Sequence, residues 1–93
     1  MRFVVYGNSM EPTYPSGSKI FVSKLFYKLI KPKVGDAIVL KDPRDGRLIL
    51  KRVKSIKKNI FRVEGDNHRS STDSRVFGEI NKEHIIGKAI LKY

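Results

Sequence analysis

The chain of 93 residues contains no cysteine, no tryptophan and only two histidines. Without cysteine it can form neither a disulfide nor a cysteine-ligated zinc site, and thiols give no information about its compartment. His68 and His84 stand far apart and do not follow the spacing of common zinc ligands. We therefore do not expect a structural or catalytic zinc.

Long apolar runs are also missing. The longest, residues 20–30, is interrupted by Ser23, Lys24 and Lys28, so it is too short and too charged to span a bilayer. The chain opens on Met1-Arg2 and reaches polar residues soon afterwards, unlike a secretory signal peptide. We expect a soluble domain, in the cytoplasm or at the periphery of a membrane.

Acidic residues are scarce: 9 aspartates and glutamates face 20 lysines and arginines, which gives a formal net charge of +11. Such a charge favours anionic partners, either nucleic acid or acidic lipid headgroups. A lysine-rich solvated surface is the alternative and stays open. Lys54, Lys57, Lys58 and Arg62 would form a basic hairpin, but aromatic residues do not alternate with them as a stacking platform for bases. We therefore do not expect a nucleic-acid partner.

Runs of β-branched and aromatic residues dominate the rest of the sequence. The expected strands are Phe3–Tyr6, Lys19–Val22, Ala37–Leu40, Leu48–Val53, Ile60–Val63 and Ile85–Leu91. Turn-forming residues separate them, and Pro43-Arg44-Asp45-Gly46 is typical of a hairpin. Short strands at this spacing predict an all-β fold, a small coiled or barrel-like sheet. Residues 1–93 are expected to form a single domain.

The segment from Phe21 to Lys33 allows two interpretations. Lys24, Lys28 and Lys31 recur at helical spacing with apolar residues between them. As a helix, the segment would be basic and amphipathic, suited to an anionic membrane surface. As a strand followed by a loop, it would pack its aromatic residues on the sheet. The sequence alone leaves both open.

Lys51 lies within the apolar run Leu48–Val53. Strand alternation places it on the same face as Ile49 and Val53. On an inward face its ammonium would lose hydration, so we expect its pKa to fall from the ordinary value of about 10.4. A neutral amine of this kind can activate a serine hydroxyl. The alternative is an exposed lysine on an edge strand.

Ser9 follows the first expected strand and precedes Met10 and Pro12. Gly7 permits a close approach of the backbone, and Pro12 fixes the chain beyond the serine. Backbone N–H groups in such a turn can stabilise an oxyanion. Met10 is interpreted as a core residue or a pocket wall. The alternative for Ser9 is a hydroxyl that only closes its own loop.

The segment from Gly65 to Gly78 is dense in small and polar residues. Its hydroxyl side chains can hold a lysine amine; they belong to Ser70, Ser71, Thr72 and Ser74. Asp73 and Arg75 are expected to pair and brace the segment. The alternative is a surface loop with an exposed ion pair, which would contribute little stability.

Together these segments resemble the signal peptidase I family of serine peptidases. The resemblance covers nearly the whole chain, in four boxes that occur in the family's order. They are Ser9-Met10-Glu11-Pro12-Thr13, then Lys24-Leu25-Phe26-Tyr27 with Pro32 to Val39, then Lys51-Arg52-Val53, and finally Gly65 to Gly78. One box alone would be a modest signal, whereas four in order are highly specific.

The resemblance implies a role for each matching residue. Ser9 would be the nucleophile, with its backbone N–H in the oxyanion hole, and Lys51 would be the general base. Ser71 would orient the Lys51 amine, and Asp73 and Arg75 would form the bracing pair. Family members cut after small side chains, in pockets that Met10 would help to line here. The resemblance therefore implies a serine endopeptidase that removes an amino-terminal signal or propeptide from a precursor protein. It also implies that no cofactor is required, since a serine–lysine dyad needs no metal.

Some family features have no counterpart in this sequence. Gly7 stands where some members carry an oxyanion-hole serine, and Gly17-Ser18 stands where Gly-Asp is usual. The amino-terminal anchor and the large β insertion are also missing. A compact form of this kind is similar to the proteases that mature nickel-type superoxide dismutase. A minimal signal peptidase acting at a membrane surface, and a non-catalytic basic module that binds membrane or nucleic acid, remain the alternatives.

Overall fold

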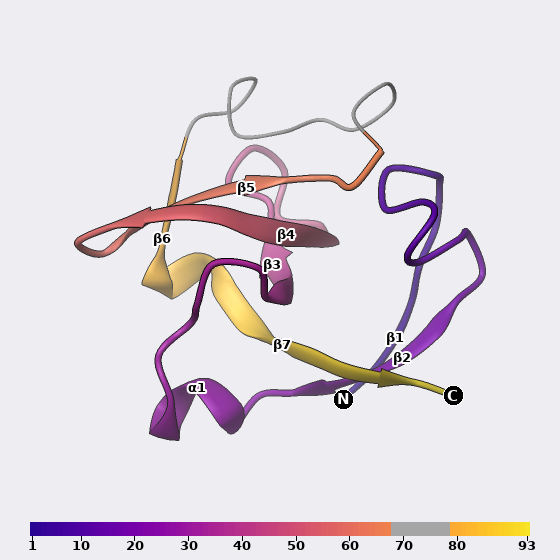
Figure 1. Ribbon diagram of the computed structural model, residues 1–93, viewed down its shortest axis with the longest axis horizontal. Helices are drawn as coiled ribbons and strands as arrows, with labels where there is room; N and C mark the ends of the chain where they lie inside the picture. Colours follow the sequence, from indigo (N-terminus) through magenta and orange to yellow (C-terminus); the bar gives the residue numbers. More distant parts are fainter. Residues whose placement is uncertain (68–78) are drawn as a thin grey trace.

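A coiled antiparallel sheet forms most of the computed structural model, which describes residues 1–67 and 79–93 (Figure 1). Its strands are β1 (Arg2–Val4), β2 (Lys19–Ser23), β3 (Ala37–Lys41), β4 (Leu48–Lys57), β5 (Ile60–Glu64), β6 (Ile80–Asn81) and β7 (Ile85–Lys92). Within the described ranges their order is β1-β2-β7-β3-β4-β5-β6, so the sheet is not closed into a barrel. The predicted all-β class is confirmed, in the form of a coiled sheet.

All six strands expected from the sequence are present, with ends that differ by a few residues. The largest difference is β4, which continues to Lys57 and pairs with both β3 and β5. The extra strand, β6, has only two residues, and η1 (Lys82–His84), a short 3-10 turn, follows it directly. A strand of two residues has no alternation to detect, which is why the pattern did not reveal it.

The segment from Phe21 to Lys33 does not form one continuous helix. Strand β2 extends through Ser23, and the helix α1 covers only Phe26–Leu29. The Ser23 hydroxyl accepts a hydrogen bond from the backbone N–H of Phe26 at 3.1 Å, which starts the helical turn. Across the described residues, no helix has the length and apolar character needed to cross a membrane.

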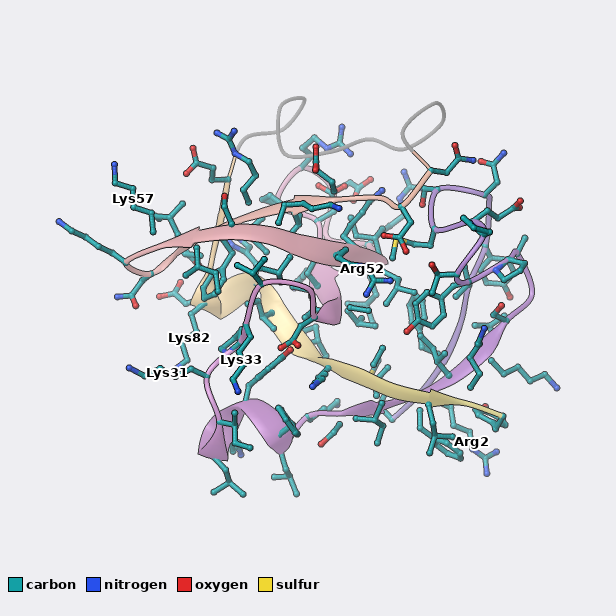
Figure 2. All side chains as sticks on the ribbon, viewed as in Figure 1. Arg2, Lys31, Lys33, Arg52, Lys57 and Lys82 are labelled. Atoms are coloured by element: carbon teal, nitrogen blue, oxygen red, sulfur yellow. The ribbon has the colours of Figure 1, made fainter. Side chains whose placement is uncertain are left out.

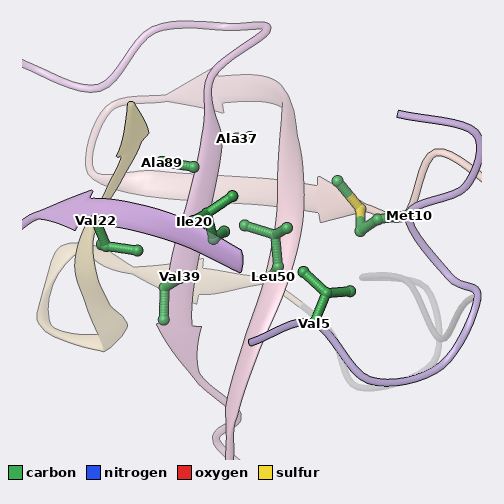
Figure 3. Packing of buried hydrophobic residues seen from close by; sticks show 8 residues of the cluster. All are labelled: Val5, Met10, Ile20, Val22, Ala37, Val39, Leu50 and Ala89. Atoms are coloured by element: carbon green, nitrogen blue, oxygen red, sulfur yellow. The ribbon is translucent and has the colours of Figure 1, made fainter. Parts of the chain in front are cut away.

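Apolar side chains pack on both faces of the sheet. The first cluster consists of Val5, Met10, Ile20, Val22, Ala37, Val39, Leu50 and Ala89 (Figure 3). The second consists of Ile38, Leu40, Val53, Phe61, Val63 and Ile80. Strand β3 contributes alternate residues to each cluster, so it is the central strand of the fold. The adjacent strand β4, which carries Lys51, is therefore held between two cores.

Candidate active site

Ser9 lies in the loop that joins β1 to β2, and the ends of this loop are tied together. The Val5 N–H donates to the Ser18 carbonyl at 2.9 Å, and the Gly17 N–H donates to the Val5 carbonyl at 2.7 Å. Gly7 has a φ of 83°, a left-handed conformation that favours glycine. Its N–H donates to the Ser16 hydroxyl at 3.1 Å. These bonds fix the position of Ser9, and Gly7 is required by the turn.

Asn67, which is distant from Ser9 in the sequence, binds the Ser9 loop. Its backbone N–H donates to the Ser9 carbonyl at 2.8 Å, and its side-chain amide donates to the Asn8 carbonyl at 3.0 Å. The end of the described segment after β5 is thereby pinned to the loop that carries the candidate nucleophile. Sequence analysis gave Asn67 no separate role, because a contact with a loop so distant in the sequence leaves no local pattern.

Lys51 is buried in the middle of β4, with only 4% of its surface exposed. It lies opposite Ile38 of β3, and Val53 on the same face is fully buried. Of the two interpretations that the sequence left open for Lys51, the structure shows the buried one. Among the described residues, only Asp42 and Lys51 are buried polar or charged side chains. Burial of a lysine amine is unusual, and the site around Lys51 is the natural place to look for a function.

Ser9 and Lys51 line the same two cavities, although they come from different elements. The larger cavity has a volume of about 450 Å³ and the smaller about 270 Å³. Ile49 also lines both of them. Within the described part of the chain, the Ser9 hydroxyl makes no hydrogen bond, so it is free to rotate toward a partner. Residues brought together from a loop and a buried strand thus share one concave surface.

Met10 belongs to the first core cluster and also borders the larger cavity (Figure 3). Its side chain is fully buried. The Tyr14 N–H donates to the Met10 carbonyl at 2.8 Å, which fixes the backbone on this side of Ser9. Met10 can therefore shape the cavity wall from within the core, and its use as a substrate pocket remains a prediction.

A buried carboxylate, Asp42, borders the smaller cavity and was missed by sequence analysis. It is 3% exposed and accepts hydrogen bonds from Arg44, at 2.9 Å from the backbone N–H, 3.1 Å from Nε and 2.8 Å from Nη2. These bonds hold the pKa of Asp42 below its usual range. The sequence Asp42-Pro43-Arg44 looked like an ordinary hairpin turn, which hid this ion pair.

A second ion pair joins the Lys51 strand to the segment after β5. Arg52 donates to both oxygens of Asp66, at 2.9 Å from Nε and 2.7 Å from Nη2, and its Nη1 donates to the Gly35 carbonyl at 2.9 Å. The Arg52 guanidinium, aided by a hydrogen bond from Thr13, lowers the pKa of Asp66. The boxes that contain Thr13, Gly35, Arg52 and Asp66 therefore meet at one place.

The remaining predicted site residues, Ser71, Asp73 and Arg75, lie outside the described residues. Within the described ranges, no group of histidine, cysteine, aspartate and glutamate side chains could hold a metal ion. The chemistry available in the described part of the site is therefore that of a hydroxyl, a buried amine, backbone amides and two carboxylate–guanidinium pairs.

Comparison with known proteins identifies the family. The sequence matches the protein family described as signal peptidase, peptidase S26, over residues 1–57 and 54–93. It is 30% identical to the mitochondrial ATP-independent inner membrane protease subunit 1a of Arabidopsis thaliana, over 95% of this chain and 67% of that protein. It is also 30% identical to the mitochondrial inner membrane protease subunit 1 of Mus musculus, over 92% of this chain and 64% of that protein. The chain spans about two thirds of the length of these relatives.

Proposed function

Because the chain belongs to the peptidase S26 family of signal peptidases, we propose that it is a serine endopeptidase with a Ser9/Lys51 dyad. It would remove an amino-terminal signal or propeptide from a precursor protein. One observation supports this proposal most strongly: Ser9 and the buried Lys51 line the same two cavities. A surface lysine would be fully hydrated and protonated at neutral pH, whereas burial favours the neutral amine that a general base requires.

The proposed reaction needs only these two side chains and water. The Lys51 amine takes the proton of the Ser9 hydroxyl as Oγ attacks the scissile carbonyl and forms the tetrahedral intermediate. The peptide C–N bond then breaks, and the Lys51 ammonium returns the proton to the leaving amine. Water, deprotonated by the same amine, hydrolyses the acyl-enzyme and restores Ser9. Hydrogen bonds between catalytic groups often tighten only when substrate binds.

An oxyanion donor is available in the backbone of Ser9. Its N–H makes no hydrogen bond to any described residue, while the neighbouring loop amides of Val5, Gly7 and Gly17 are all bonded. A donor held in place before the reaction stabilises the developing negative charge without reorganisation. Gly7 carries no hydroxyl, so in this proposal the backbone supplies the donor that a serine side chain supplies in some family members.

Three further roles are proposed from the family resemblance. Ser71 would accept a hydrogen bond from the Lys51 amine and aim it at Ser9, while Asp73 and Arg75 would brace their segment. The bonds from Asn67 to the Ser9 loop support this, because Asn67 begins the stretch of sequence that leads to Ser71. Replacing Ser71 by alanine should therefore slow cleavage without abolishing it.

The proposed substrate is a precursor with small side chains before the scissile bond, as the family resemblance implies. Two kinds of precursor need testing. The resemblance to compact maturation proteases suggests the amino-terminal extension of nickel-type superoxide dismutase. The names of the relatives suggest precursors processed at a membrane.

Mass spectrometry of a panel of precursor peptides tests the proposal. The wild type should produce one discrete cut after a small residue, and Ser9→Ala and Lys51→Ala should each produce none. Lys57→Ala, which removes an exposed lysine from the same strand, is the matched control and should cut like the wild type. Cleavage by Ser9→Ala or Lys51→Ala at the wild-type rate would eliminate the dyad.

A further inference from the structure

The surface around α1 exposes large aliphatic side chains at its tip. Leu29 is 88% exposed, Leu25 is 65% exposed and Ile30 is 45% exposed. Leu29 buries little of its surface in the folded chain, and most of the Leu25 surface is also exposed, so packing within the fold does not account for them. A group of exposed apolar residues on a small domain often marks an interaction surface.

Lysines surround this apolar tip. Residues 21–34 contain four lysines, and no aspartate or glutamate occurs among them. Lys24, Lys28, Lys31 and Lys33 are all exposed, and Lys82 of η1 is exposed nearby. Figure 2 shows Lys31, Lys33 and Lys82 gathered beside α1. We call the five lysines the basic rim, and Leu25, Leu29 and Ile30 the apolar tip.

Two grooves flank α1 and combine the same two chemistries. One, of about 410 Å³, is lined mainly by apolar residues: Met1, Phe21, Leu25, Ile90 and Leu91 are among them. The other, of about 340 Å³, has an apolar floor bordered by Lys24, Lys28 and Lys82. Lys24 lines both grooves. The lysines that line the grooves can bind an anionic group, and the adjacent apolar side chains would be stabilised by burial away from water.

We propose that the apolar tip and the basic rim form a docking surface for an anionic lipid bilayer. Leu25 and Leu29 would enter the boundary between headgroups and acyl chains, while the rim lysines would contact lipid phosphates, with one headgroup in the groove between Lys28 and Lys82. Apolar burial and attraction to anionic lipid together drive such interfacial binding, and each lysine near the surface contributes about fivefold in affinity.

The exposed side chains favour a bilayer over nucleic acid. A nucleic-acid surface uses aromatic rings to stack bases, but the aromatic residues of α1 are occupied within the protein. Phe26 and Tyr27 are only half exposed and pack edge to face at 5.4 Å between ring centroids. The residues presented to solvent are aliphatic, which a phosphate backbone does not bind and a lipid phase does.

The docking surface lies apart from the candidate active site. Figure 1 shows α1 at the lower end of the molecule, whereas the loop that carries Ser9 lies at the opposite, upper side. None of the residues that line the two active-site cavities belongs to α1 or to the basic rim. The inference therefore does not rest on the proposed peptidase activity, and either can fail without the other.

Sedimentation of the full chain with lipid vesicles tests the inference. The wild type should bind vesicles that contain phosphatidylglycerol, bind phosphatidylcholine vesicles far more weakly, and lose affinity as salt rises. Lys24→Gln/Lys28→Gln should weaken binding about 25-fold, given about fivefold per lysine. Leu25→Ser/Leu29→Ser should weaken it by about tenfold or more, since both leucines lose their apolar burial.

A charge-matched control separates this surface from the net charge of the whole protein. Lys54→Gln/Lys57→Gln removes the same two charges from exposed positions on β4. It should retain nearly all vesicle binding. Equal loss in the control, or no effect of the leucine substitutions, would show general electrostatic attraction and overturn the proposal. Tighter binding to a short DNA duplex than to anionic vesicles would also overturn it. Circular dichroism confirms that each variant is folded.

Discussion

Two lysine environments in this protein differ in almost every respect. Lys51 is buried between two cores in the longest strand, and the elements around it are joined by backbone bonds and by the Arg52–Asp66 pair. Lys28 is exposed on a helix of four residues, and the exposed leucines Leu25 and Leu29 lie just before this helix and at its end. The residue type is the same, and its surroundings decide which proposed role it suits, proton transfer for Lys51 and a surface charge for Lys28.

The α1 region is nevertheless held in place by a few specific contacts. The Tyr27 hydroxyl donates to Asp36 at 2.7 Å, and the Lys88 ammonium lies 4.4 Å from the centre of the Phe26 ring. Burial and the hydrogen bond to Asp36 raise the pKa of Tyr27. These contacts fix the base of α1 and leave its tip free. The comparison predicts that changes at the site affect cleavage most strongly, whereas changes of the exposed residues at α1 affect mainly surface binding.

The largest expected effect comes from replacing Lys51 by methionine, with Lys28→Met as the comparison. Lys51→Met removes the proposed base, and cleavage should fall by at least about 10³-fold, as when a catalytic group of a triad is removed. Its melting temperature should stay equal or rise, because an apolar side chain replaces a buried amine. Lys28→Met should change neither quantity. Loss of cleavage only together with unfolding would indicate that Lys51 is structural.

The next effect comes from breaking one anchor in each region. Asp66→Asn disrupts a partly buried ion pair and should cost about 1–3 kcal/mol of unfolding free energy, whereas Tyr27→Phe should cost about 0.5–1.5 kcal/mol. Urea denaturation at neutral pH measures both. A larger cost for Tyr27→Phe would reverse the comparison between the two regions.

The smallest expected effect is the pH dependence that Asp66 adds to stability. Since its pKa is lowered in the folded state, its contribution is complete above the unfolded pKa of about 3.9 and is lost as pH falls through the lower, folded value. The pKa of Asp42 is lowered in the same way, so the Asp66→Asn variant keeps the part of the pH dependence of stability that Asp42 contributes. Denaturation between pH 3 and 7 should show a flatter acid limb for the variant. Identical slopes would mean that Asp66 gains nothing from Arg52.

The sequence was sufficient for features that depend on local pattern. Alternation predicted the strands and placed Lys51 on the same face as Ile49 and Val53, and the structure then decided between a buried and an exposed lysine. It could not reveal contacts between distant segments. The bonds from Asn67 to Asn8 and Ser9 depend on how the loops meet in three dimensions.

Ambiguous local patterns account for the other differences. The segment from Phe21 to Lys33 carried helical spacing, but β2 pairs with β7 through Ser23 and leaves room for only one helical turn. Asp42 looked like a turn residue, but it is buried and accepts hydrogen bonds from Arg44. The roles of Ser71, Asp73 and Arg75 remain predictions from the family resemblance.

The pH dependence of peptide cleavage tests the central claim most directly. If Lys51 is the buried general base, kcat/KM should rise along an acid limb and level off well below the ordinary lysine pKa of about 10.4. The substrate is the peptide that the wild type cuts in the mass-spectrometry panel. With this peptide, the Lys57→Ala variant should show the same acid limb as the wild type. A rate that still climbs steeply beyond pH 10 would contradict the account, because it would mean that the catalytic amine is an ordinary hydrated lysine.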